Sequence, residues 1–192
     1  MNATELKAAD PDRFDKEYQE WCTHSCHYDW WDCVEEQFKE ECAPMGIEVD
    51  TVEFWLSYSQ GDYATFTGRV RMGEWMKHHG YDLKYHALYL AMQSYGSNAV
   101  LHHGRSIAKY VDLDYQPGNT YPEGVFSDLP QEAWDELCQE QFEAEDWDQL
   151  LLEHVRELES DLYDRLEQEY EYLTSEEQFI EQCECNDVTF DN

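Results

Sequence analysis

The sequence predicts an α+β fold, with an antiparallel sheet of about four to five strands over residues 47–115 packed with an N-terminal helix and long acidic C-terminal helices. β-Branched and aromatic residues alternate with polar ones over residues 47–72, as in half-buried strands. Residues 11–42 and 130–185 instead place apolar groups three and four positions apart, as in amphipathic helices. With 192 residues, 42% of them hydrophobic, the chain is predicted to form one domain over residues 1–192.

The N-terminal helical region is predicted to begin at Pro11, after a frayed lead over residues 1–10. Apolar groups recur at helical spacing to about Glu41, either as one long helix or as two helices with a break near His27–Asp29. Pro44 then disfavours continuation and ends the helix.

A β-hairpin is predicted next. Residues 47–58 and 63–72 alternate as strands, and the SQGD sequence at 59–62 is typical of a turn in which Gly61 takes a positive φ.

The rest of the middle third is less clearly patterned. Residues 73–82 are predicted to form a short helical or irregular connection, and residues 83–93 fit a buried strand and a helix equally well because they are apolar throughout. Residues 106–115 alternate as a strand, and the Pro- and Gly-rich residues 116–124 form a loop.

The C-terminal region is predicted to be an amphipathic helix of many turns, interrupted once around Glu145–Asp148. Thr174 stands three residues before Glu177, a capping-box spacing that predicts the start of a short terminal helix. Residues 188–190 are predicted to close the fold as a strand.

The charge limits the class of partner. The net charge is −32, and residues 131–192 hold 22 acidic side chains against two basic ones. Such a chain repels nucleic acid and anionic membranes, so we expect no direct nucleic-acid binding, no membrane association and a basic partner. The N-terminus lacks signal-peptide features, so a cytosolic protein is expected.

The seven cysteines are expected to be reduced thiols without a disulfide framework. One cluster leaves a structural zinc site open beside packed thiols and surface imidazoles, although no metal and no cofactor are predicted. Its members are Cys22, His24, Cys26, His27 and Cys33.

No enzyme signature is present in the sequence: it lacks a phosphate-binding glycine loop, a nucleophile elbow and a His-Glu-x-x-His helix. We therefore expect a non-enzyme. Residues 69–110 hold six basic groups and two acidic ones. These cations could form a nucleic-acid patch with Trp75 and Tyr85 as stacking groups, but the preferred interpretation is that they face the protein's own acidic helices.

Two segments carry a resemblance to a known group of proteins. VEFWLSYSQGDYATFTGRV (52–70) resembles the strand–SQGD–strand motif of a family of uncharacterised tailed-phage proteins, and departs from it at Tyr63, where a Gly is usual. YEYLTSEEQFIEQCECNDVTF (170–190) is similar to that family's acidic tail, and residues 31–52 fit the helix leading into its first strand. The resemblance implies a phage origin and the cytoplasm of a bacterial host; it implies no activity.

The acidic helices are the predicted binding site. If residues 131–171 were one helix, they would span roughly 60 Å, with a carboxylate about every 4 Å, close to the roughly 3.4 Å per phosphate along one DNA strand. Residues 10–41 would have to lie alongside to supply a second row, and an exposed Trp147 or Tyr172 could anchor the interface. The predicted partner-binding residues are Glu132, Asp135, Glu136, Glu140, Glu143, Glu145, Asp146, Asp148, Glu153, Glu157, Asp161, Asp164, Asp32, Glu35 and Glu36.

These observations favour a phage-encoded nucleic-acid mimic that binds and inhibits a basic nucleic-acid-binding protein of the host, such as a restriction or CRISPR effector, a nuclease or RNA polymerase. The alternative is a protein–protein interaction module whose acidic helices serve solubility or a homodimer. A metal-dependent or hydrolytic enzyme is a third class.

Overall fold

The computed structural model describes residues 1–25, 29–56, 61–103, 109–116 and 118–191. The chain divides into two compact units. Unit 1 comprises Met1–Val34 and Asp164–Asn192, and unit 2 comprises Glu35–Tyr163. The predicted single domain over residues 1–192 stays a prediction, because two of the helices contribute residues to both units.

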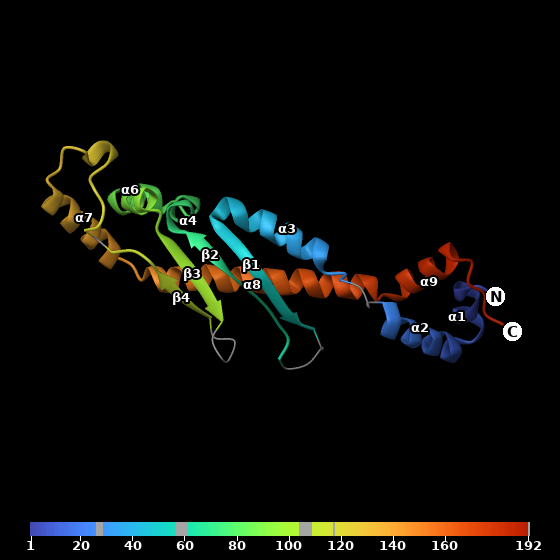
Figure 1. The fold of residues 1–192 in the computed structure, drawn as a ribbon. Coiled ribbons are helices and arrows are strands. Elements are labelled where there is room, and N and C mark those ends of the chain that lie inside the picture. The colour runs from blue at the N-terminus through green and yellow to red at the C-terminus, as the bar shows by residue number, and fades with distance from the viewer. Residues whose placement is uncertain (26–28, 57–60, 104–108, 117, 192) are drawn as a thin grey trace. The chain divides into compact units, whose positions relative to one another are not determined.

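Unit 2 is built on a four-stranded antiparallel sheet in the order β1-β2-β3-β4 (Figure 1). The strands are β1 (Ile47–Trp55), β2 (Tyr63–Arg71), β3 (Asn98–His103) and β4 (Lys109–Leu113). The β1–β2 hairpin confirms the prediction of two alternating strands, and its register shifts once, between Val49 and Thr51. Ser59 and Gln60 of the SQGD motif lie outside the described residues.

The two faces of the sheet differ in burial. Paired residues on adjacent antiparallel strands share a face, so Ile47, Val70 and Ala99 lie in one row, and all three are fully buried. The next row over, on the opposite face, begins with Glu48 and Arg69, which are exposed. The sheet therefore has one face in the core and an opposite face that is largely open to solvent, as alternating strands predict. On that opposite face Thr65 is buried, and its hydroxyl donates to the Glu159 carboxylate.

Helices gather at the end of the sheet where β2 ends (Figure 1). They are α4 (Met72–His78), α5 (Tyr81–Lys84) and α6 (His86–Tyr95). The ambiguous apolar segment at 83–93 is thus mainly helical, and fully buried Leu88, Ala91 and Met92 explain its lack of a polar face. Between α3 (Asp32–Cys42) and β1, the short 3-10 turn Ala43–Met45 ends at Gly46, whose φ of 79° favours glycine.

The acidic C-terminal region forms two helices in place of one. They are α7 (Gln131–Glu143) and α8 (Trp147–Leu173), and the interruption falls where it was predicted. A loop with the 3-10 turn Gly124–Phe126 precedes α7, and the Thr120 hydroxyl in it accepts from the Trp134 indole at 3.1 Å. Because α7 and α8 are separate, the predicted row of roughly 60 Å on one axis does not form.

Unit 1 joins the two ends of the chain. Its helices are α1 (Ala3–Ala9), α2 (Pro11–Ser25) and α9 (Glu176–Cys185), and its core contains Leu6, Phe14 and Phe179. The Phe14 and Phe179 rings meet edge to face with centroids 5.5 Å apart. The N-terminal amino group donates to the Phe190 carbonyl at 2.9 Å, and the Phe190 N–H donates back to the Met1 carbonyl.

Three local predictions are wrong in unit 1. Residues 1–10 are not a frayed lead, because Asn2 and Glu5 form a capping box for α1 and Leu6 is buried. The α9 cap is Ser175, which accepts from the Gln178 N–H, whereas the Thr174 hydroxyl donates to the Tyr170 carbonyl. Residues 188–190 form no strand, although Phe190 keeps its backbone bonds to Met1. Of the two alternatives for the N-terminal helical region, the structure has two helices, since α2 ends at Ser25 and α3 begins at Asp32. His27, in the expected break, lies outside the described residues.

Candidate interaction surface

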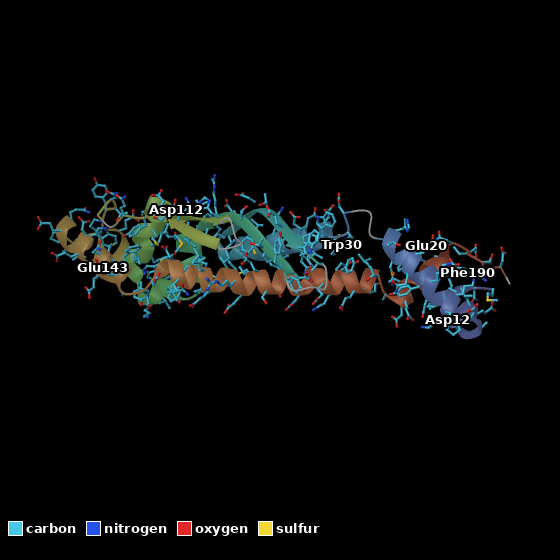
Figure 2. The ribbon with its side chains drawn as sticks, turned by 90° about the horizontal axis from the view of Figure 1, so that it is seen from below. Asp12, Glu20, Trp30, Asp112, Glu143 and Phe190 are labelled. Carbon is cyan, nitrogen blue, oxygen red and sulfur yellow. The ribbon has the colours of Figure 1, made fainter. Side chains whose placement is uncertain are left out.

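Exposed carboxylates follow the side of α7 that faces away from the core. Trp134 and Cys138 are fully buried. Each residue turns an α-helix by about 100°, so Glu132, Glu136, Glu140 and Glu143 lie about 160–240° around the axis from Trp134. All four are exposed, and Figure 2 labels Glu143 at the end of the helix.

The first half of α8 repeats this arrangement. Leu151, Val155 and Leu162 are fully buried, while the exposed Glu153, Glu157 and Asp161 lie about 160–240° from Val155 and about 6 Å apart along the axis. We call these seven exposed carboxylates, four on α7 and three on α8, the acidic helical face. They are Glu132, Glu136, Glu140, Glu143, Glu153, Glu157 and Asp161.

The charge of the acidic helical face is almost undiluted. Arg156 is the one Lys or Arg in residues 131–163. Two of the carboxylates are bonded to amide side chains on the same helix: Gln139 donates to Glu143, and Gln149 donates to Glu153 at 2.8 Å. These bonds orient the carboxylates without neutralising them, so the surface keeps a strong negative potential.

Three of the predicted partner-binding residues belong instead to the junction between α7 and α8. Glu145 accepts from the Lys84 ammonium at 2.8 Å and from the Tyr85 hydroxyl. These two hydrogen bonds lower the pKa of the Glu145 carboxyl, and the bond from Lys84 has the larger effect. The Asp146 carboxylate accepts from the Gln149 N–H at 3.0 Å and caps α8. Asp148 is exposed as a whole residue, but its carboxyl is partly buried. This partial burial, followed by the charges of Asp146 and Asp112, raises the pKa of the carboxyl.

The remaining predicted residues are scattered. Asp135 accepts from Gln131 at 2.7 Å, and Glu35 pairs with Lys39 at 2.6 Å. Glu36 is exposed on the unit 2 part of α3. The exposed Asp32 and Asp164 belong to unit 1, together with all of α2, so unit 2 does not contain the second acidic row expected from residues 10–41.

The predicted aromatic anchor Trp147 is a core residue. It is 3% exposed, its indole N–H donates to the Phe142 carbonyl at 2.8 Å, and it meets the Tyr81 and Tyr85 rings edge to face. The prediction that it is exposed is wrong, because its place at the first turn of α8 turns it toward α5. Tyr172, in unit 1, is 58% exposed.

The basic residues of segment 69–110 were expected to face the protein's own acidic helices, and the structure confirms this for one of them. Lys84 faces the acidic α7–α8 junction through Glu145, whereas Arg71 pairs with Glu48 of β1 at 3.3 Å. Trp75 and Tyr85, the proposed stacking groups, are 1% and 7% exposed and cannot offer a ring face to a base. Arg105 lies outside the described residues.

The cysteine and histidine cluster is only partly described. Cys26 and His27 lie outside the described residues, Cys33 is an exposed thiol, and the Cys22 thiol contacts the Thr174 carbonyl at 3.6 Å. Within the described residues, no three His, Cys, Asp or Glu side chains are grouped so that they could hold a metal ion.

Sequence reasoning missed one polar cluster between α4 and α8. His154 Nδ1 accepts from the buried Trp75 indole at 3.1 Å and lies 3.3 Å from His79 Nε2. Burial, then the neighbouring His79 and His78, lowers the pKa of His154 to about 4. Trp75 and His79 are four residues apart, but His154 is 75 residues beyond His79 in sequence. The one signal in the sequence is His154 itself, a polar residue next to the buried Val155.

The fold and surface define an α+β protein in which helices pack with a four-stranded antiparallel sheet and display an acidic face. The chain belongs to the family of a domain of unknown function, DUF8835, which it matches over residues 30–176. The match contains all of unit 2 and hence the whole acidic helical face. No curated protein and no solved structure matches the chain. Within the described residues, no helix has the length and apolar character needed to cross a membrane.

Proposed function

We propose that this protein is a phage-encoded nucleic-acid mimic that binds and inhibits a DNA- or RNA-acting enzyme in the cytoplasm of a bacterial host. The observation that supports it best is the acidic helical face, where seven exposed carboxylates stand opposite the buried sides of α7 and α8. The phage and host assignments rest on the resemblance of residues 52–70 and 170–190.

The acidic helical face offers a row of negative charges to a phosphate-binding cleft. On α8 the carboxylates recur about every 6 Å of axis, about half the charge density of one DNA strand, whose phosphates recur roughly every 3.4 Å. Glu36 and the exposed Glu40 on α3 add charge to unit 2. The helices hold these charges in place before binding, so a basic partner would be steered to the face rapidly and would bind it in a strongly salt-dependent way.

Capture of the partner tests the proposal. The protein is immobilised and exposed to bacterial lysate at roughly 50 mM and roughly 500 mM NaCl, which differ several-fold in screening length. We expect a nucleic-acid-binding enzyme to be retained at low salt, released at high salt and displaced by added duplex DNA or structured RNA.

A charge-neutral variant assigns the binding to the acidic helical face. Its substitutions are E132Q, E136Q, E140Q, E153Q, E157Q and D161N. A matched control removes the same charge from exposed carboxylates of unit 1. Its substitutions are D12N, D15N, E20Q, E177Q, E181Q and D187N. The proposal requires the first variant to lose the partner and the second to keep it; equal retention by both would refute it.

The alternative function, a protein–protein interaction module without mimicry, is favoured by the open face of the sheet. Trp55 on β1 is 60% exposed, and the Thr51 and Thr67 hydroxyls lie 2.6 Å apart on the adjoining strands. A partner held on this face would be lost on Trp55→Ala and retained by the charge-neutral variant.

A further inference from the structure

A cleft of about 680 Å³ lies between β4 and the α7–α8 junction. On one side it is lined by Val111, Asp112 and Leu113, which are consecutive in β4, and on the other by residues 142–148. All of these residues belong to unit 2. Figure 2 labels Asp112 and Glu143 on the two sides.

β4 is an edge strand of the described sheet, so one side of its backbone is unpaired there. The Asp114 N–H donates to the Asn98 carbonyl of β3 at 3.0 Å. Because the bonds of an antiparallel ladder alternate, Asp112 also bonds toward β3, whereas the N–H and C=O groups of Val111 and Leu113 point away from it. An extended chain can bond to such an edge as an added strand.

The residues that line the cleft favour a positively charged peptide as the added strand. Five carboxylates line the cleft, and of these Glu145 is paired with Lys84. The raised pKa of Asp148 reflects burial and repulsion from Asp146 and Asp112, a repulsion that a cation would relieve. A second copy of this chain is disfavoured, because β4–β4 pairing would bring two such clefts together on molecules that each carry a net charge of −32.

We propose that this cleft binds an extended, lysine- or arginine-rich peptide segment of a partner protein, which adds to β4 as a fifth strand while its basic side chains pair with the cleft carboxylates. The inference goes beyond the proposed function, because strand addition needs no imitation of nucleic acid and uses the edge of the sheet. Of the acidic helical face, Glu143 alone also lines the cleft.

A synthetic peptide tests it. The probe is a ten-residue peptide of alternating lysine and threonine, titrated into the ¹⁵N-labelled full-length protein. We expect saturable binding below about 1 mM, with amide shifts concentrated at Val111 and Leu113. A peptide of the same sequence with N-methyl groups on alternate residues keeps its charge but cannot form the ladder, so it should bind at least tenfold more weakly.

Two variants separate the backbone contribution from the charge contribution. Val111→Pro removes an outward N–H without removing a bond to β3, a position where edge strands tolerate proline, and should abolish the binding. D112N/D148N keeps the edge and should weaken binding about tenfold. Circular dichroism and the chemical shifts of residues away from the cleft establish that both variants fold.

Three results would overturn the proposal: equal binding of the N-methylated peptide, no saturation by 1 mM, or a concentration-dependent dimer that Val111→Pro disrupts, which would identify a second copy as the occupant. The E132Q/E136Q/E140Q/E153Q/E157Q/D161N variant leaves the cleft carboxylates intact. It should therefore still bind the peptide to the same sites, even if it loses the captured enzyme.

Discussion

Trp134 is completely buried in α7, and the Thr120 hydroxyl is the acceptor for its indole N–H. Thr120→Val keeps the shape of the side chain and leaves that donor unsatisfied, so we expect a loss of about 1–3 kcal/mol in the free energy of unfolding. Urea denaturation followed by tryptophan fluorescence measures it. Thr120→Ser, which retains the hydroxyl, is the control, and an equal loss in both variants would show that the bond contributes little.

His154 should make stability depend on pH. Its pKa of about 4 in the folded protein lies below the ordinary 6.5, so between these values the unfolded chain binds a proton that the folded chain does not. The ionisable neighbours that act on His154 are His79 and His78, and His79 is acted on in turn by His78 and Glu157. The burial of neutral His154 therefore does not reduce the free energy of unfolding above pH 6.5, and reduces it increasingly as the pH falls toward 4.

The matched variant is His154→Asn, which keeps an acceptor for the Trp75 indole and does not titrate. Between pH 7 and 5.5 we expect wild-type stability to fall more steeply than that of the variant. The difference at the acid end should be about 1 kcal/mol, because the ring is only half-buried and solvent screens its charge. Parallel pH profiles in urea denaturation would contradict this account.

At the level of the element, α9 depends on Ser175. Ser175→Ala removes the side-chain acceptor for the Gln178 N–H and should cost about 1 kcal/mol. Thr174→Ala should cost less, because the Thr174 hydroxyl bonds back to the Tyr170 carbonyl and satisfies no free helix donor. Thermal denaturation of the two variants compares them, and the reverse order would restore Thr174 as the cap.

Elements with one buried and one solvated side could be predicted from the sequence. The β1–β2 hairpin and the helices α7 and α8, with the break between them, are examples. Elements buried on more than one side could not. Residues 86–92 of α6 are all buried or partly buried, so this helix shows no polar side in the sequence. The two-residue ambiguity at Thr174 and Ser175 arises because both can cap a helix and only the backbone conformation selects between them.

The site could be predicted as a region and less well as a set of residues. Acidic composition located α7 and α8, and helical geometry explains why Glu132 and Glu157 are exposed. Composition could not separate them from Glu145 and Asp146, whose partners Lys84 and Gln149 come from tertiary folding and helix capping. Trp147 was misjudged for the same reason, since its neighbours Tyr81 and Tyr85 are remote in sequence.

At the scale of the whole molecule, a net charge of −32 opposes folding through self-repulsion. Added NaCl should therefore raise the melting temperature between roughly 20 mM and roughly 300 mM. The charge-neutral variant of the acidic helical face should melt higher than wild type at low salt and gain less from added salt. Scanning calorimetry measures both, and a melting temperature that falls with salt would contradict the account.

A surface of like charges opposes folding through self-repulsion, and residues 131–163 hold one Lys or Arg, Arg156, to offset it. Such a surface is expected where the charge itself is functional. The central claim is that the acidic helical face occupies the nucleic-acid site of its partner. The most direct measurement is the equilibrium affinity of the captured partner for this protein, determined across a salt series with and without its nucleic acid. The account predicts a steep loss of affinity with salt and full mutual exclusion; a stable ternary complex, or an affinity insensitive to salt, would contradict it.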